Sequence, residues 1–128
     1  MGKKLYETEP VFTATLNTCI KVLNPYLSKD LYSLLFKEKE EIHQTVYTQP
    51  ALFAIGYSLA KLWESWGASP EAVMGHSVGE ITAACIAGIF SLEDGAKLIC
   101  HRARLMQDIQ ETGAMVSLHH SHREVIKY

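Results

Sequence analysis

Apolar side chains recur at helical spacing along much of the chain, and they predict its first elements. A helix is expected over 10–23, with Pro10 near its first turn, where a missing amide proton does little harm. The stretch LYSLLF at 31–36 predicts a second, short helix. It runs into the charged cluster KEKEE at 37–41, which we expect to be solvated surface.

The strongest helical pattern begins at Pro50 and ends at Gly67, which is a typical C-terminal glycine. Ser58, Lys61 and Ser65 fall off the apolar stripe of this predicted helix. The stripe consists of Leu52, Ile55, Leu59, Leu62, Trp63 and Trp66.

An apolar run, AVMG at 72–75, fits a buried strand, and two more helical patterns follow it. The first covers 77–87 and ends at Gly88; the second starts from a capping box of Ser91 and Asp94 and runs to about residue 110. GAMVSL then predicts a second strand from near Ala114. The order of helix, strand, sharp turn and helix indicates an α/β fold. Because a parallel sheet needs several strands, we expect a slice of a larger domain.

The composition narrows the class of protein. The 128 residues match about one domain, and 48% hydrophobic with 20% charged residues is typical of a soluble globular chain. Twelve basic and fourteen acidic residues leave no basic patch for nucleic acid or an anionic membrane. Three cysteines without close pairing favour a reducing, cytoplasmic setting. The longest uncharged stretch, 45–60, is too short and too polar to span a bilayer.

The stretch MGHSVGE at 74–80 carries the candidate chemistry. Ser77 and Glu80 have the spacing of a helix capping box. A capping box does not need the flanking Gly75 and Gly79, whereas a nucleophile elbow does, because side chains there would collide with neighbouring segments. The elbow would expose the Ser77 hydroxyl and direct the Val78 N–H, at the positive end of the helix, toward a developing oxyanion.

Arg102 falls on the apolar stripe of the last long helix, whereas Arg104 lies on its polar face and should be solvated. An inward guanidinium is costly unless it meets an anion. An internal acidic partner, a side chain that reaches the edge of the core, and a bidentate substrate carboxylate all remain open from the residues alone. The apolar stripe is formed by Leu98, Ile99, Leu105, Met106 and Ile109.

Two further residues and one histidine cluster are best explained by structural roles when each is taken alone. Gln49 precedes Pro50 and reads as an N-terminal helix residue. His76 would point away from Ser77 on an extended segment, so it is poorly placed as a base. The cluster HHSH at 119–122 has no paired cysteine or carboxylate at ligand spacing, and no metal site is expected.

Taken together, the motifs TQPA at 48–51, GHSVGE at 75–80 and an arginine at position 102 make the chain resemble a known family. It is similar to malonyl-CoA:acyl carrier protein transacylases and to the acyltransferase domains of polyketide synthases, the latter being the nearer branch. The similarity runs over nearly the whole chain. It implies part of an α/β-hydrolase-like acyltransferase core, with 1–112 in the large subdomain and 113–128 opening a small ferredoxin-like subdomain.

The resemblance also implies a role for each matching residue. Ser77 would be the nucleophile that is acylated, and Val78 would supply one oxyanion donor. Arg102 would pair with the carboxylate of a malonyl-type group, Gln49 would line the acyl pocket, and His76 would belong to the motif without acting as base. The acyl group would pass from malonyl-CoA to the phosphopantetheine thiol of an acyl carrier protein, with no bound cofactor, in polyketide or fatty acid biosynthesis. The rest of a polyketide synthase is a further expected partner.

Two departures from the family pattern limit this expectation. The family's G-Q-G-S-Q segment, which gives the other oxyanion donor, would fall just before Met1, and its catalytic histidine matches none of the histidines of this chain. We therefore expect the 128-residue polypeptide to be inactive or very weak alone. Two alternatives remain: a serine hydrolase or thioesterase with water as acceptor, and a non-catalytic fragment that needs a partner.

Overall fold

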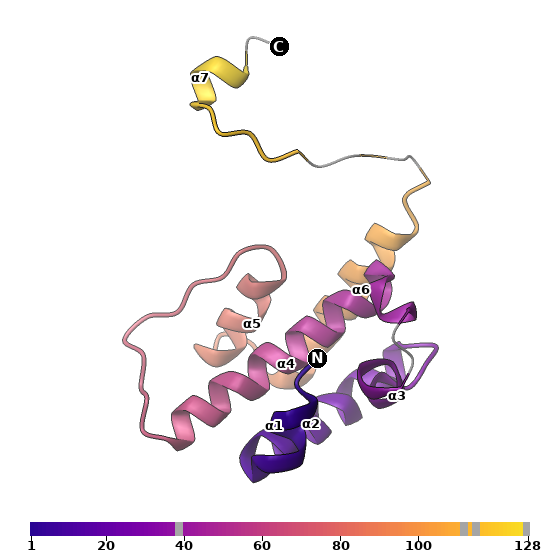
Figure 1. The fold of residues 1–128 in the computed structure, drawn as a ribbon, viewed down its shortest axis with the longest axis vertical. Coiled ribbons are helices and arrows are strands. Elements are labelled where there is room, and N and C mark those ends of the chain that lie inside the picture. The colour runs from indigo at the N-terminus through magenta and orange to yellow at the C-terminus, as the bar shows by residue number, and fades with distance from the viewer. Residues whose placement is uncertain (38–39, 111–112, 114–115, 127–128) are drawn as a thin grey trace.

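The computed structural model describes residues 1–37, 40–110, 113 and 116–126. The described elements are helical (Figure 1). The α-helices are α1 (Lys3–Thr8), α2 (Pro10–Leu23), α3 (Leu31–Phe36), α4 (Thr45–Ser65), α5 (Val78–Ile86), α6 (Leu92–Gln107) and α7 (His122–Val125), with 3-10 turns η1 (Asn24–Tyr26) and η2 (Glu41–His43).

The long helix α4 lies at the centre and contacts α2, α5 and α6. Figure 1 shows α1, α2 and α3 on one side of α4 and α5 on the other, while the chain beyond α6 extends away toward α7. Within the described ranges, no helix is both long enough and apolar enough to cross a bilayer. The predicted helices over 10–23 and 31–36 are confirmed with the same bounds.

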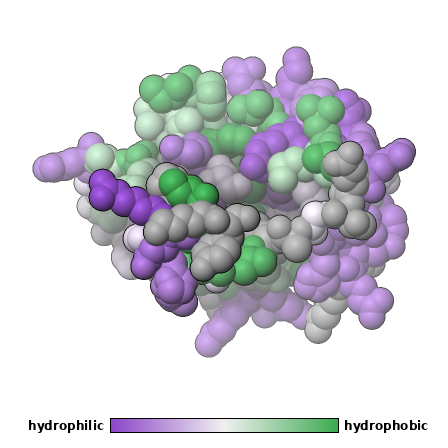
Figure 2. Space-filling model, turned by 90° about the horizontal axis from the view of Figure 1, so that it is seen from above, coloured by the Kyte–Doolittle hydropathy of each residue, from purple (hydrophilic) through white to green (hydrophobic). Residues whose placement is uncertain are grey.

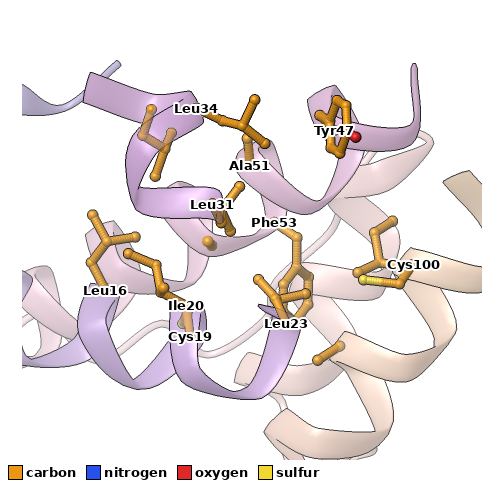
Figure 3. Close-up of a cluster of buried hydrophobic side chains, with 14 of the residues drawn as sticks. Leu16, Cys19, Ile20, Leu23, Leu31, Leu34, Tyr47, Ala51, Phe53 and Cys100 are labelled. Atoms are coloured by element: carbon orange, nitrogen blue, oxygen red, sulfur yellow. The ribbon is translucent and has the colours of Figure 1, made fainter. Parts of the chain in front are cut away.

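The core is assembled where α2, α3, α4 and α6 meet (Figure 3). Fully buried side chains include Leu16 and Leu23 of α2, Leu31 of α3, Phe53 of α4 and Ile99 of α6. Burying each such side chain contributes roughly 1.5–3 kcal/mol to the stability of the fold, relative to leaving it exposed. This burial holds α4 and α6 in fixed register, and both helices carry candidate site residues.

The helix that was expected to start at Pro50 starts at Thr45, and Pro50 lies inside it. Proline removes one helical hydrogen bond, but the turn before it has bonds of its own. The amides of Tyr47 and Thr48 donate to the Gln44 carbonyl at 2.9 and 2.8 Å, and the Thr48 hydroxyl donates to the Ile42 carbonyl at 2.6 Å. The helix therefore continues through the proline.

The expected apolar stripe of α4 is partly wrong. Leu52, Trp63 and Trp66 are exposed, whereas Ser58 is fully buried. The Ser58 hydroxyl donates to the Ala54 carbonyl at 2.7 Å, which satisfies its hydrogen bond within the helix and lets it face the core. The buried face of α4 is formed by Tyr47, Gln49, Pro50, Ala51, Phe53, Ala54, Ser58 and Leu62.

The strand expected at 72–75 is also wrong, since this segment is irregular and the described residues contain no strand. In Figure 1 the chain between α4 and α5 runs as a wide loop. An extended segment becomes a strand only when a neighbour completes its backbone hydrogen bonds, and the described residues place no neighbouring strand here. The second expected strand falls partly on 114–115, outside the described residues, and 116–118 are not strand.

On α6, the expected cap is confirmed but the expected buried face is only partly right. The Ser91 hydroxyl oxygen accepts from the Asp94 N–H at 3.0 Å, and the helix ends at Gln107, before the expected 110. The side that packs inward consists mostly of small residues: Gly95, Ala96, Ile99, Cys100 and Ala103. Four of the larger apolar residues are exposed: Leu98, Leu105, Met106 and Ile109. Small side chains allow α6 to approach α4 and α5 closely.

Gly95 should be essential for this approach. A Cβ at position 95 would overlap the Cys85 sulfur and lie 3.1 Å from Phe53 Cζ. We expect Gly95→Ala to lower the free energy of unfolding by about 1–3 kcal/mol, because a packed interface must shift. Urea unfolding followed by circular dichroism measures this. The exposed Lys97→Ala on the same helix is the control, and equal stability of both variants would contradict the prediction.

Burial should also protect the cysteines chemically. Desolvation raises the pKa of the Cys19 and Cys100 thiols to about 12, so the folded chain keeps these protons when the unfolded chain loses them above about pH 9. Their contribution to stability is complete below pH 9 and declines as pH rises toward 12. At pH 8 we expect iodoacetamide to label both thiols roughly a thousandfold more slowly in buffer than in urea. Equal rates in mass spectra would refute this.

Candidate functional site

Ser77 stands at a sharp bend immediately before α5. It has φ 55° and ψ −116°, which makes it the one non-glycine residue with positive φ among those described. Such a backbone is costly for a residue with a side chain and is typical of functional turns. Ser77 makes no side-chain cap, and Glu80 Oε2 accepts from the Gly75 N–H at 3.1 Å. The capping-box interpretation is therefore wrong, and the geometry is that of a strained elbow.

The two glycines of the motif differ in their surroundings. A Cβ at Gly75 would overlap the Gly79 carbonyl group and the Glu80 nitrogen, so the bend leaves no room for a side chain. A Cβ at Gly79 would meet nothing within 4 Å. The expected collision therefore holds at position 75, where the backbone of residues 79 and 80 lies against the glycine. It is wrong at position 79, where the space is open.

Arg102 of α6 reaches both α4 and the elbow. One terminal nitrogen, Nη1, donates to Gln49 Oε1, and the other, Nη2, donates to Ser77 Oγ at 3.0 Å. Arg102 is half-buried, whereas Arg104 is exposed, as expected. The described residues place no carboxylate within 4 Å of the Arg102 guanidinium, so the internal acidic partner left open above is not found there.

Gln49 is buried on α4, with 5% of its surface exposed, and it lies one residue before Pro50. Its Nε2 donates to the Met106 sulfur at 3.3 Å, while its Oε1 accepts from Arg102. An N-terminal structural role for Gln49 is therefore wrong. Sequence reasoning missed Met106 as a polar contact; its position four residues after Arg102, one helical turn away, was the signal that could have found it.

The remaining residues of the motif frame Ser77. Val78 is half-buried at the first position of α5, and the described part of the chain offers no acceptor for its N–H. His76 is exposed, and its carbonyl accepts from the Gly79 N–H at 2.9 Å. Among the described side chains, Ser77 Oγ is hydrogen-bonded to Arg102 and to no imidazole.

Figure 1 shows α7, at the C-terminal end of the chain, far from α5 and the elbow. His120 Nδ1 is 3.8 Å from Glu124 Oε2, with both side chains largely exposed. Among the described residues, no three histidine, cysteine or carboxylate side chains are grouped so that they could hold a metal ion.

An apolar groove of about 810 Å3 adjoins the elbow, between α4, α5 and the loop that joins them. Its apolar lining includes Leu52, Ala60, Trp63, Val73 and Ile86. Trp63 is 58% exposed and Leu52 44%. Figure 2 shows hydrophobic side chains exposed among hydrophilic ones on the face seen from above. The structure thus combines a strained serine and a half-buried arginine with apolar surface open to solvent.

Residues 1–127 match the family described as the acyl transferase domain. The chain belongs to this family. The predicted resemblance is therefore confirmed, and the motif around Ser77 is part of an acyltransferase domain sequence.

Individual relatives and solved structures are consistent with this family. The chain is 42% identical over 125 residues to the polyketide synthase GfsB of Streptomyces halstedii, covering 98% of this chain and 2% of that protein. It resembles the acyltransferase domain from the second module of the salinomycin polyketide synthase, at 42% identity and TM-score 0.80 over 87% of this chain and 26% of that one. An acyl carrier protein S-malonyltransferase from Vibrio cholerae matches at 31% identity and TM-score 0.69, over 81% and 33% of the two chains.

The chain is shorter than the solved acyltransferase chains to which it is similar. It spans about a quarter to a third of the solved acyltransferase chains it matches. The helical arrangement described above is therefore shared with one portion of the acyltransferase domain fold.

The different surroundings of the two motif glycines lead to a direct test. Gly75→Ala should lower the free energy of unfolding by about 1–3 kcal/mol or displace Ser77, because the added Cβ meets backbone that cannot move aside. Gly79→Ala lies in a helix with open space around it, and it should leave stability unchanged or raise it by about 0.5–1 kcal/mol. Urea unfolding measures the stability of both variants. A Gly79→Ala variant less stable than Gly75→Ala would contradict this description of the bend.

Proposed function

We propose that this chain is the part of an acyltransferase that binds and transfers a malonyl-type acyl group. The single observation that carries the proposal is the contact between Arg102 and Ser77, which joins a fixed cation to a strained serine hydroxyl at 3.0 Å. The acyl donor would be a coenzyme A thioester, and the acceptor would be the phosphopantetheine thiol of an acyl carrier protein. Membership of the acyl transferase domain family supports both assignments.

Ser77 is the proposed nucleophile. Its oxygen attacks the thioester carbonyl, its proton passes to a base, and coenzyme A leaves as the free thiol. The carrier-protein thiol then attacks the seryl ester, which restores the Ser77 hydroxyl. The Val78 N–H, without an acceptor among the described residues and at the N-terminus of α5, is the proposed oxyanion donor.

Arg102 is the proposed partner of the acyl carboxylate. Its guanidinium presents planar donors that match a carboxylate in bidentate fashion. In the structure, these donors are held by the neutral oxygens of Gln49 and Ser77, and a carboxylate is a stronger acceptor than either. Gln49 lines this side of the proposed pocket from α4, and His76 belongs to the motif without acting as base.

This geometry favours the acyltransferase over the alternative of a hydrolase of neutral esters. A hydrolase of neutral esters has no use for a guanidinium beside the nucleophile, whereas a malonyl group carries a charge that the guanidinium would stabilise. The 128-residue chain by itself should react slowly, because Ser77 has no imidazole partner among the described residues and an unassisted serine is weakly nucleophilic.

The exposed apolar groove favours a second candidate for the isolated chain, a fragment that requires further protein to complete an α/β core. In that completed domain, 1–112 would lie in the large subdomain and 113–128 would open a small ferredoxin-like one. The remaining part of a polyketide synthase is the proposed setting.

Acylation of Ser77 tests the proposed function. With the chain incubated separately with malonyl-CoA and acetyl-CoA, intact mass and peptide mapping should show slow, preferential malonyl transfer to Ser77. Ser77→Ala should abolish it. Arg102→Ala should lower the malonyl-to-acetyl rate ratio by about 10- to 100-fold, since hydrogen bonds to charged groups contribute about 1.5–3 kcal/mol. Arg104→Ala, exposed on the same helix, is the control.

Two outcomes would contradict this assignment. Equal malonyl and acetyl rates that Arg102→Ala leaves unchanged would favour the hydrolase, and rapid turnover would refute the expected weakness of the isolated chain. If no acyl-Ser77 forms, the same variants are tested in a chimera in which residues 1–110 replace their counterpart in the salinomycin second-module acyltransferase domain. An active chimera that Ser77→Ala does not inactivate would exclude Ser77 as nucleophile.

A further inference from the structure

The buried amide of Gln49 is held between two residues of a single turn of α6. Its oxygen accepts from Arg102 Nη1, and its nitrogen donates to the sulfur of Met106 at 3.3 Å. Arg102 and Met106 are four residues apart, so both side chains project from one side of the helix. The residues come from α4 and α6, whose packing fixes the distance between them.

The chemistry of the two neighbours permits only one orientation of this amide. A guanidinium has donors and no acceptor, and therefore it requires the amide oxygen. A thioether sulfur is a weak acceptor without a proton, and therefore it requires the amide nitrogen. Rotating the amide by half a turn would place its NH2 group against the Arg102 donors and its oxygen against the sulfur, so that both hydrogen bonds would be lost.

The position of Arg102 depends on this orientation. Its second terminal nitrogen donates to Ser77 Oγ at 3.0 Å, so the Gln49 oxygen and the Ser77 oxygen together hold the guanidinium plane. The Gln49 side chain is buried, and an amide there that lost its partner would be costly. Met106 is itself 45% exposed, and its size alone does not explain this contact with a buried polar group.

We propose that Met106 is a positioning residue: its sulfur fixes the orientation of the Gln49 amide, which in turn holds the Arg102 guanidinium beside Ser77. The effect on acyl selectivity rests on the proposed function of Arg102, whereas the effect on the amide and the guanidinium does not. A methionine that only filled space would affect stability and leave the Arg102 donors unchanged.

Nuclear magnetic resonance of the 15N-labelled 128-residue chain tests the positioning directly. In the native chain, the Gln49 side-chain amide protons should exchange with water more slowly than those of the exposed Gln110. Met106→Leu keeps an apolar side chain but removes the acceptor, and it should speed exchange of the Gln49 Nε2 and Arg102 Nη protons about fivefold. Met106→Gln supplies a carbonyl acceptor and should return both rates to within about twofold of native.

Leu105→Met, the reverse chemical change at a neighbouring position of α6 that is 66% exposed, is the control and should leave both rates unchanged. The proposal is overturned if the native Gln49 and Gln110 amides exchange equally fast. It is also overturned if Met106→Leu, with backbone signals elsewhere unshifted, leaves the Arg102 protons at their native rate. Should Met106→Leu fail to fold, Met106→Gln decides: exchange faster than native by more than about twofold at Arg102 would overturn the proposal.

The malonyl-to-acetyl acylation ratio separates this proposal from the proposed function. Met106→Leu should lower the ratio about fivefold, and Met106→Gln should restore it. Faster exchange at Arg102 with an unchanged ratio would support the positioning role of Met106 and contradict the role of Arg102 as carboxylate partner.

Discussion

The close packing of α6 against α4 is the constraint on which the candidate site depends. Gly95, Ala96 and Ala103 present a narrow face that lets α6 approach closely, and Phe53 and Ile99 fill the space around it. A close-packed interface leaves little freedom for one helix to slide along the other. The residues at the end of the interface away from Gly95 are therefore held in place as firmly as those in the core. Gln49 on one helix and Arg102 on the other meet for this reason.

The elbow adds a second constraint, which is local. The positive φ of Ser77 and the lack of room for a side chain at Gly75 show that the backbone bends sharply between the loop and the helix. The bend brings the hydroxyl to Arg102 rather than to the amides of its own helix. Strain of this kind persists only where surrounding packing holds it, and α5 is anchored by Cys85 beneath Gly95. The local bend and the helix packing therefore stabilise one arrangement together.

Polar groups at the site form a chain of donors and acceptors in a fixed order. Met106 accepts from Gln49, Gln49 accepts from Arg102, and Arg102 donates to Ser77. Because a guanidinium can only donate, the donations start at Arg102 and run toward Gln49 and Met106 on one side and toward Ser77 on the other. The same guanidinium is held by uncharged oxygens within the described structure, and this leaves it suited to a stronger, anionic acceptor.

Local signals in the sequence determined the helices over 10–23 and 31–36, the cap at Ser91 and the identity of the motif around Ser77, because these depend on residues close together in the chain. The tertiary structure decided the rest. Ser58 faces the core while Trp63 faces solvent, and Gln49 joins Met106 to Arg102, because helix faces are chosen by what packs against them. The segment 72–75 has strand composition but no strand, since pairing requires a neighbour that composition cannot supply.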